Sequence, residues 1–279
     1  TALLCDSGQS LEIVSEQNLR DNCHKYPMII VPELYSGLDD DTFDILKSYA
    51  ANGGSLLIVG AKTSCIFAQK GFGFKAEYYD ELPEIPNWAN CNIGHNNRGE
   101  YSSKIPCYFS LCGDNHGVTK GACITNSQCD NKKVFGNLHN SLRGEGVPFS
   151  VKFDFGKGKI GVIGIDLGTQ YHDGMHQLHR ELIKNISDEM YNPLAKIESV
   201  CGILELVCLE KDNRIMLQLV NANGNHSNPT SITEGVIPPV LDAKLSIKTD
   251  SIPQKLVLQP ENKLIDFEYK DGRAYFTVE

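Results

Sequence analysis

The sequence lacks a long hydrophobic run and has fewer basic than acidic residues. Its longest apolar stretches, such as 28–31 and 56–60, are far shorter than the roughly 18 residues that a membrane-spanning helix needs. Lys and Arg number 26 against 35 Asp and Glu, and the formal net charge is −9. Binding to nucleic acid or to an anionic membrane depends on basic residues, so we expect neither partner. Neutral or weakly charged partners are favoured.

The ten cysteines form no CxxC motif and match no metal or disulfide spacing. We interpret most of them as small buried hydrophobes in a reducing compartment. The sequence leaves open whether a disulfide forms within the group Cys107, Cys112, Cys123 and Cys129. The first residues lack the basic and apolar pattern of a secretory signal, so we expect a cytoplasmic protein. A chain that opens on Thr1 rather than Met is also compatible with a fragment or a processed product.

An α/β pattern is clearest between residues 26 and 60. Residues 28–31 form a continuous apolar run, typical of a strand that is buried on both faces of a parallel sheet. An amphipathic helix is predicted to follow, with capping carboxylates at 39–41 and a stop at 52–54. Residues 55–60 then form a second strand. Strand, helix and strand in this order make a βαβ unit, whose two strands are parallel.

The remaining pattern divides the 279 residues into two domains. An earlier strand at 10–14 and helix at 16–22, a hairpin at 149–165 and a helix at 176–190 suit a Rossmann/flavodoxin-like α/β domain over 1–193. Its irregular insertion covers about 78–140. From 194 to 279, six or so short strands separated by turn signals such as Asp271-Gly272 predict a small all-β sandwich.

Several stretches resemble a known family. Residues 26–32 (YPMIIVP), 38–41 (LDDD) and 49–60 (YAANGGSLLIVG) resemble the class I glutamine-amidotransferase-like domain of bacterial β-galactosidase-type glycosidases, which is called the trimerisation domain. Residues 155–164 (FGKGKIGVIG) resemble the late hairpin of that domain. Residues 217–221 (LQLVN) and 237–239 (IPP) resemble the terminal β-domain of such enzymes.

The resemblance implies an accessory region of a glycoside hydrolase. In that family the catalytic carboxylates lie on a preceding TIM barrel, and a barrel alone takes roughly 250 residues. This chain has no room for one, so no catalytic carboxylate is carried over. The implied roles are oligomerisation, walling of an active site or sugar contact, with a catalytic barrel domain or a homo-oligomer partner.

An alternative is a free-standing amidotransferase-like enzyme that uses Cys65 and His172. Cys65 follows a strand, and residues 168–172 (GTQYH) resemble the stretch that supplies the family's base. A thiolate beside an imidazole is a competent nucleophile. However, Thr63 and Phe67 stand where the nucleophile elbow needs small residues. We therefore favour a degenerate scaffold with a buried Cys65 and no catalytic residue in this chain.

Carbohydrate contact usually combines aromatic faces with planar polar groups. The irregular middle segment supplies both kinds, and Glu33 follows the first strong strand, where open α/β sheets bind ligands. A capping role for Glu33, and an anchoring role for Trp88, are the competing interpretations. The sugar-binding candidates are Glu33, Trp88, His95, Asn96, Arg98 and Tyr101. A stand-alone carbohydrate-binding or interaction module is a third hypothesis.

No metal or cofactor is expected. His172, Asp173, His176 and His179 would stack at one-turn spacing on an early-starting helix, but no diagnostic offset such as HExxH occurs. Residues 71–73 (GFG) lack the third glycine of a dinucleotide-binding fingerprint.

Overall fold

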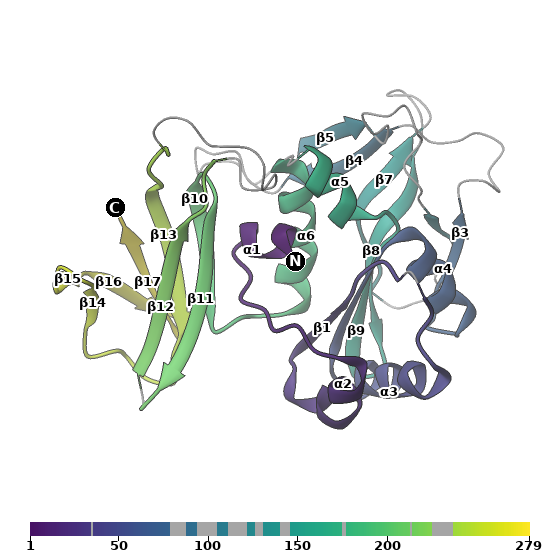
Figure 1. Ribbon diagram of the computed structural model, residues 1–279, viewed down its shortest axis with the longest axis horizontal. Helices are drawn as coiled ribbons and strands as arrows, with labels where there is room; N and C mark the ends of the chain where they lie inside the picture. The colour runs from purple at the N-terminus through teal and green to yellow at the C-terminus, as the bar shows by residue number, and fades with distance from the viewer. Residues whose placement is uncertain are drawn as a thin grey trace. The chain divides into compact units, whose positions relative to one another are not determined.

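The computed structural model of the 279-residue chain is shown in Figure 1. For some residues inside strands, among them 88–93 and 105–110, only the backbone is described. The structure describes residues 1–34, 36–78, 88–93, 105–110, 122–125, 131–139, 146–174, 177–212, 214–224 and 237–279.

The chain forms two compact units. One, here called the α/β unit, comprises residues 13–191, and the other, the β unit, comprises residues 1–12 and 192–279. The first twelve residues therefore pack with the β unit, although the sequence places them in the α/β domain. Helix α1 (Ala2–Asp6) contacts strand β11 (Leu204–Lys211), and Leu3 is buried. As independent folding domains, 1–193 and 194–279 stay a prediction.

A seven-stranded sheet forms the centre of the α/β unit, in the order β1-β2-β9-β8-β7-β4-β5. The first three strands are parallel: β1 (Met28–Val31), β2 (Ser55–Val59) and β9 (Gly158–Ile163). The other four continue antiparallel: β8 (Val147–Phe155), β7 (Lys133–His139), β4 (Trp88–Ile93) and β5 (Ile105–Ser110). The predicted fold class, α/β with a parallel sheet followed by an all-β part, is confirmed.

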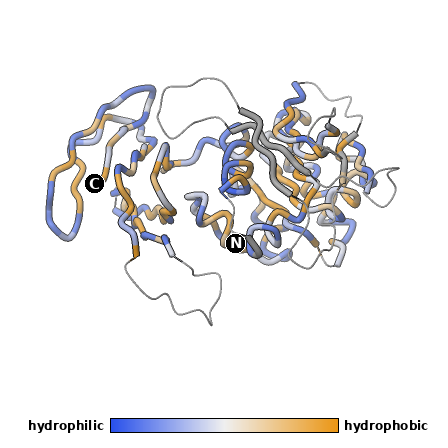
Figure 2. Tube along the Cα trace, turned by 90° about the horizontal axis from the view of Figure 1, so that it is seen from above, coloured by the Kyte–Doolittle hydropathy of each residue, from blue (hydrophilic) through white to orange (hydrophobic). Residues whose placement is uncertain are grey.

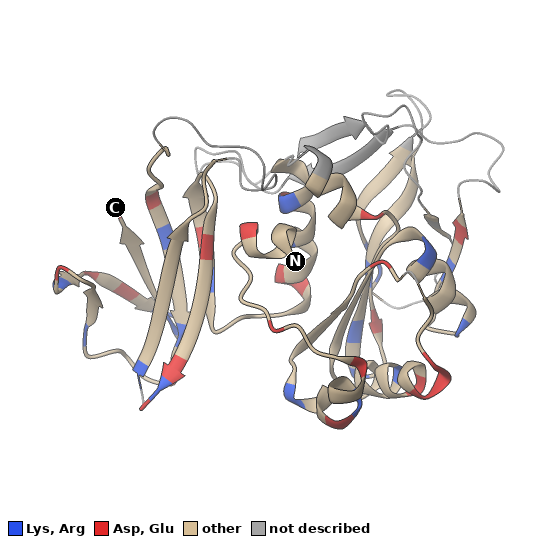
Figure 3. Ribbon diagram, in the orientation of Figure 1, with Lys and Arg blue, Asp and Glu red and all other residues tan. Residues whose placement is uncertain are grey.

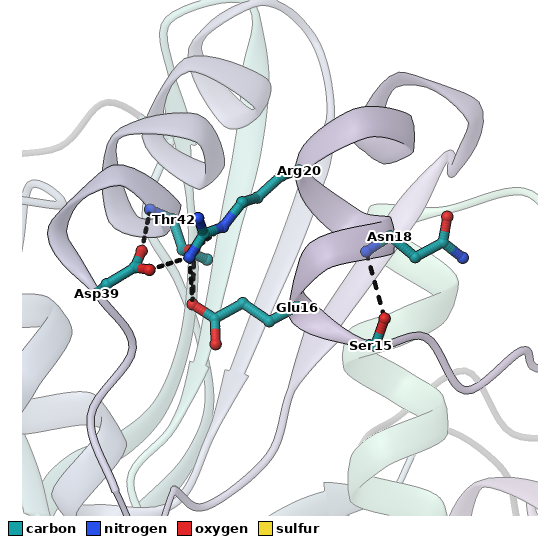
Figure 4. A network of polar contacts seen from close by, with 6 residues as sticks. All are labelled: Ser15, Glu16, Asn18, Arg20, Asp39 and Thr42. Atoms are coloured by element: carbon teal, nitrogen blue, oxygen red, sulfur yellow. Dashed lines mark hydrogen bonds and ion pairs between the residues drawn. The ribbon is translucent and has the colours of Figure 1, made fainter.

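Helices α2 (Glu16–Asn22) and α3 (Asp40–Ala51) are joined by a polar network (Figure 4). Arg20 donates from Nε to the Thr42 hydroxyl at 3.0 Å and pairs with Asp39, the N-cap of α3. Asp39 Oδ1 in turn accepts from the Thr42 backbone N–H at 2.8 Å. The helix expected at 16–22 is therefore present. The strand expected at 10–14 is absent, and the exposure of Ile13 shows that no sheet face covers this segment.

Two layers of helix cover the sheet. On one face, Phe43 of α3 and Phe67 of α4 (Ala61–Gln69) pack edge to face, with ring centroids 5.0 Å apart. On the other face lies α6 (Gln177–Met190), whose Met190 packs so closely that a Cβ on Gly161 would meet its sulfur at 2.4 Å. Figure 2 shows the hydrophobic segments along the strands and helices of this unit.

Three smaller elements complete the α/β unit. They are the 3₁₀ turn η1 (Cys23–Lys25) and the strands β3 (Lys75–Tyr78) and β6 (Ala122–Thr125), which pair with each other. A further helix, α5 (Leu167–Gly174), was not predicted. It forms because Asp166 caps it and Tyr171 is buried, both of which depend on the fold rather than on local pattern.

The β unit contains a four-stranded antiparallel sheet and two hairpins. The sheet order is β10 (Ala195–Cys201), β13 (Leu241–Lys248), β17 (Arg273–Val278) and β16 (Phe267–Lys270). The hairpins are β11 with β12 (Arg214–Asn221) and β14 (Leu256–Leu258) with β15 (Lys263–Ile265). Ile197 and Leu245 of the sheet share one core with Leu206 of β11, so the two layers form a sandwich.

The predicted turn at Asp271-Gly272 is confirmed. Both residues have positive φ, at 52° and 75°, as a two-residue hairpin turn requires. The next residue, Arg273, is buried and donates to Ser246 Oγ, Asn192 Oδ1 and the Pro193 carbonyl, each at 2.9 Å. Figure 3 shows basic and acidic residues interspersed along the ribbon of both units.

Candidate functional site

Strands β1, β2 and β9 are parallel, so their carboxyl ends meet at one edge of the sheet. This is the edge where open α/β sheets bind ligands. The chain places Glu33 after β1, the turn at Gly60 after β2, and Asp166 after β9. The edge therefore carries two carboxylates and the start of helix α4.

Glu33 is built into the turn that starts α4. Its Oε1 accepts from the Lys62 backbone N–H at 3.1 Å, and its Oε2 accepts from that of Thr63 at 3.2 Å. The Thr63 hydroxyl donates to the Pro32 carbonyl at 3.2 Å and accepts from the Leu34 N–H at 2.8 Å. These contacts satisfy amides that the first turn of a helix leaves without a partner. The capping interpretation of Glu33 is thus visible in the geometry, whereas its sugar contact stays a prediction.

Gly60 makes this arrangement possible. Its φ is 122°, a conformation that residues with a side chain rarely adopt. A Cβ at this position would lie 1.8 Å from Glu33 Oε2, which is well inside van der Waals contact. The strand-to-helix elbow of this chain is therefore at Gly60, closed by the Glu33 carboxylate.

Cys65 lies five residues beyond that elbow, in the second turn of α4. It is half-buried and lines an open groove of about 340 Å³ between α4 and β3. The other lining residues are Lys62, Ile66, Gln69, Ala76 and Tyr78. A nucleophile elbow holds its nucleophile at the strained turn itself. The position of Cys65 therefore differs from that of the nucleophile in the enzyme hypothesis.

His172 lies in the last turn of α5 and is exposed. Residues 168–172, which resemble the stretch that supplies the family's base, are helical. Asp166 Oδ1 accepts from the Thr169 N–H at 3.2 Å, and its Oδ2 accepts from the Thr169 hydroxyl at 2.6 Å. The second carboxylate of the edge, like the first, caps a helix. The Cys65–His172 pair stays the disfavoured alternative, and the elbow geometry weighs against it.

Trp88 is the first residue of β4. The strand register places it opposite Ser110 of β5 and His139 of β7. Two positions along β4, Asn90 is opposite Tyr108 and Asn137. The register therefore places Trp88, Ser110 and His139 in one row of the ladder, and Asn90, Tyr108 and Asn137 in another. The candidates His95, Asn96, Arg98 and Tyr101 lie outside the described residues.

The sequence analysis did not include Asn90, Tyr108 and Asn137, which the strand register brings into one row. The signal was available, because residues 88–93 (WANCNI) alternate between apolar and polar types after the tryptophan. The neighbouring strand 105–110 (IPCYFS) alternates less clearly. The sequence does not show which strands pair with 88–93, so it cannot predict which polar residues stand opposite one another.

The histidines that sequence spacing grouped are distributed over two helices. His172 is on α5, whereas His179 is on α6 and is 2% exposed. Residue 176 lies outside the described part of the chain. Among the residues that the structure describes, no group of three or more possible ligands could hold a metal ion. In the same part of the chain, no helix is both long and apolar enough to cross a membrane.

Together, the α/β unit and the β sandwich are similar in fold to part of each of two solved glycosidases. The chain is similar to α-L-fucosidase isoenzyme 2 from Paenibacillus thiaminolyticus, with a TM-score of 0.66 and 14% identity, over 99% of this chain and 42% of that one. It is also similar to a β-galactosidase from Bacillus circulans sp. alkalophilus, with a TM-score of 0.53 and 15% identity, over 99% and 36%. No protein-family model and no curated protein matches the sequence.

At such identities the likeness is one of fold. The resemblance predicted from the sequence is confirmed at this level. The chain spans less than half the length of the glycosidases it matches.

Proposed function

We propose that this chain is a non-catalytic accessory region of a glycoside hydrolase whose catalytic barrel is supplied by another part of the enzyme. The observation that carries the proposal is the coverage: 99% of this chain aligns with a fucosidase, yet only 42% of that enzyme is matched. The carboxyl edge of the parallel strands supports it, because Glu33 and Asp166 both cap helices there.

The accessory role that we propose is contact with sugar along strands β7, β4 and β5. The register places Trp88 in one row of the ladder, and Asn90, Asn137 and Tyr108 in a row two positions along. Neighbouring strands lie roughly 4.8 Å apart, a spacing close to the width of a pyranose ring. Rings and planar polar groups at this spacing suit a hexose of the kind that a galactosidase or fucosidase releases.

The single tryptophan of the chain makes this role directly measurable. We expect the intrinsic fluorescence of Trp88 to change saturably when the protein is titrated with D-galactose or L-fucose. Asn137→Ala should weaken binding roughly fivefold to tenfold, because one amide hydrogen bond is lost. Gln218→Ala, which removes an amide from the β unit, is the matched control and should leave the affinity unchanged.

A linear drift in fluorescence that an acyclic polyol reproduces would contradict the sugar contact. So would equal affinities for wild type and Asn137→Ala. Trp88→Phe, which abolishes the signal, confirms the source of the emission.

We also propose that a second copy of the chain packs on the β11–β12 hairpin. The register places Val207, Leu209, Met216 and Val220 on one face, and each is 39–49% exposed. Among the described residues the hairpin pairs with no further strand, so its edges are also open to a second copy, and its exposed apolar residues form a patch of the kind that marks interaction sites. Sedimentation should show a mass that rises with concentration, and Leu209→Lys with Met216→Lys should remain monomeric. A wild-type monomer at all concentrations would contradict it.

A further inference from the structure

Two cysteines occupy opposite register positions on the last two strands of the large sheet. Strands β4 and β5 pair over six consecutive positions, and Cys91 is directly opposite Cys107. The ladder continues on both sides, with Ala89 opposite Phe109 and Ile93 opposite Ile105, and it contains no bulge. A slip of one residue would instead set Cys91 opposite Pro106 or Tyr108. The unbroken ladder therefore fixes the pairing.

Opposed positions on antiparallel strands meet the main requirement of a disulfide. Their Cα atoms are roughly 4.5 Å or 5.5 Å apart, depending on whether the pair is hydrogen-bonded. Disulfides join Cα atoms roughly 4.4–6.8 Å apart. Both kinds of pair fall within this range, so the Cα separation of Cys91 and Cys107 permits the bond.

We propose that Cys91 and Cys107 form a dithiol that closes reversibly as a cross-strand disulfide. The oxidant is a low-molecular-weight disulfide such as oxidised glutathione. One cysteine attacks it as a thiolate, a mixed disulfide forms and one molecule of reduced glutathione leaves. The second cysteine then attacks the protein sulfur of the mixed disulfide, the Cys91–Cys107 bond forms and the second glutathione thiol leaves. The pair loses two electrons and two protons, and the oxidant gains both.

The bond would act at the end of the sheet. Strand β5 is terminal, and among the described residues its one ladder partner is β4. Oxidation therefore ties the terminal strand covalently to its neighbour and closes a ring that contains residues 92–106. The pair occupies its own row of the ladder, separate from the rows of Trp88 and Asn90. The proposal does not depend on sugar binding.

The pairing also differs from the group that sequence spacing left open. Cys123 lies on β6, opposite Glu77 of β3, in a different sheet from Cys107. Cys112 and Cys129 lie outside the described residues. Cys91, which the spacing did not include, is the cysteine that the ladder brings to Cys107.

The test is thiol mapping of the full chain in its folded state. The protein is incubated with oxidised glutathione, the remaining thiols are blocked with iodoacetamide, and the digest is analysed by mass spectrometry without reduction. We expect one peptide pair, joined through Cys91 and Cys107, that separates when reduced glutathione is in excess. Cys91→Ser and Cys107→Ser should each abolish it, and Cys123→Ser, the matched control, should retain it.

Either of two results in the wild-type protein would overturn the proposal. Cys107 could be found joined to Cys112, Cys123 or Cys129. Alternatively, Cys91 and Cys107 could both remain as thiols while other cysteines of the chain carry glutathione. Because both readouts use the unaltered chain, they hold even where a serine variant fails to fold.

Discussion

The two halves of the large sheet use their polar residues differently. Where the strands are parallel, Glu33 and Asp166 stand at the ligand-binding edge but cap helices α4 and α5. Where the strands are antiparallel, the register brings Trp88, Asn90 and Asn137 to nearby rows of the ladder. The difference shows that the carboxylates at the carboxyl edge of the parallel strands have structural roles. We therefore place the proposed sugar contact on the antiparallel strands.

The largest expected effect concerns the elbow of the parallel half. Gly60→Ala should lower the free energy of unfolding by about 3–5 kcal/mol, from backbone strain and from displacement of the Glu33 carboxylate. Gly53→Ala is the matched control, since Gly53 has the same φ of 121° and no atom within 4 Å of a Cβ. Gly53→Ala should lower the free energy of unfolding by about 1–2 kcal/mol, from backbone strain alone. Equal losses in urea unfolding would show that Glu33 does not close the elbow.

A second change tests the capping role of Glu33 itself. Glu33→Gln keeps one accepting oxygen but cannot accept from both Lys62 and Thr63, so one amide of α4 loses its partner. The free energy of unfolding should fall by about 1–2 kcal/mol. Glu261→Gln, an exposed carboxylate of the β unit, should stay within roughly 0.5 kcal/mol of wild type. An unchanged free energy of unfolding in Glu33→Gln would contradict the capping role and favour ligand binding by Glu33.

A smaller, pH-dependent effect ties helix α6 to the antiparallel half. The hydrogen bond from Lys133, with Lys152 nearby, holds the pKa of the Glu189 carboxyl below its usual range. A lowered pKa in the folded state stabilises the fold above the unfolded value near 4.5, and this contribution is lost as the pH falls through the folded pKa. Glu189→Gln should therefore destabilise at neutral pH by under about 1 kcal/mol, because solvent screens the pair.

The difference between wild type and Glu189→Gln should shrink as the solution is acidified below pH 4.5. Glu181→Gln removes the same charge from the same helix and is the control. A difference that stays constant with pH would show that the ion pairs contribute nothing.

The smallest expected effect concerns Cys65, whose thiol should show ordinary reactivity. Placed inside α4 and not at the elbow, Cys65 should react with iodoacetamide no faster than the exposed Cys201. Burial raises the pKa of the Cys208 thiol, so Cys208 should react more slowly than Cys201. Alkylation of Cys65 that is tenfold faster than that of Cys201 would revive the Cys–His enzyme.

The sequence predicts the parts of the fold that local patterns control. The apolar run at Met28, the capping carboxylate at Asp39 and the turn at Asp271-Gly272 each act within a few residues, and all are confirmed. Helix α5 was missed because its support is tertiary, through the burial of Tyr171. Strand β10 was missed for the same reason, because its pairing partner β13 is far along the chain.

The candidate site was harder to predict because its decisive contacts are non-local. Glu33 reaches Lys62 and Thr63 across the sheet edge, so the elbow cannot be located from the residues around Cys65 alone. The rows at Trp88 and Asn90 depend on the register of three strands, which sequence alternation does not supply. The sequence shows the types of the candidate residues, but only the fold shows which residues lie beside them.

The central claim, that the chain assists a glycosidase without catalysing the reaction itself, is tested most directly by turnover. The purified chain is incubated with aryl β-galactoside and aryl α-L-fucoside, and release of the aryl alcohol is followed against a blank. The account predicts no release above the blank at any protein concentration. Sustained release in proportion to the concentration of the chain would contradict it.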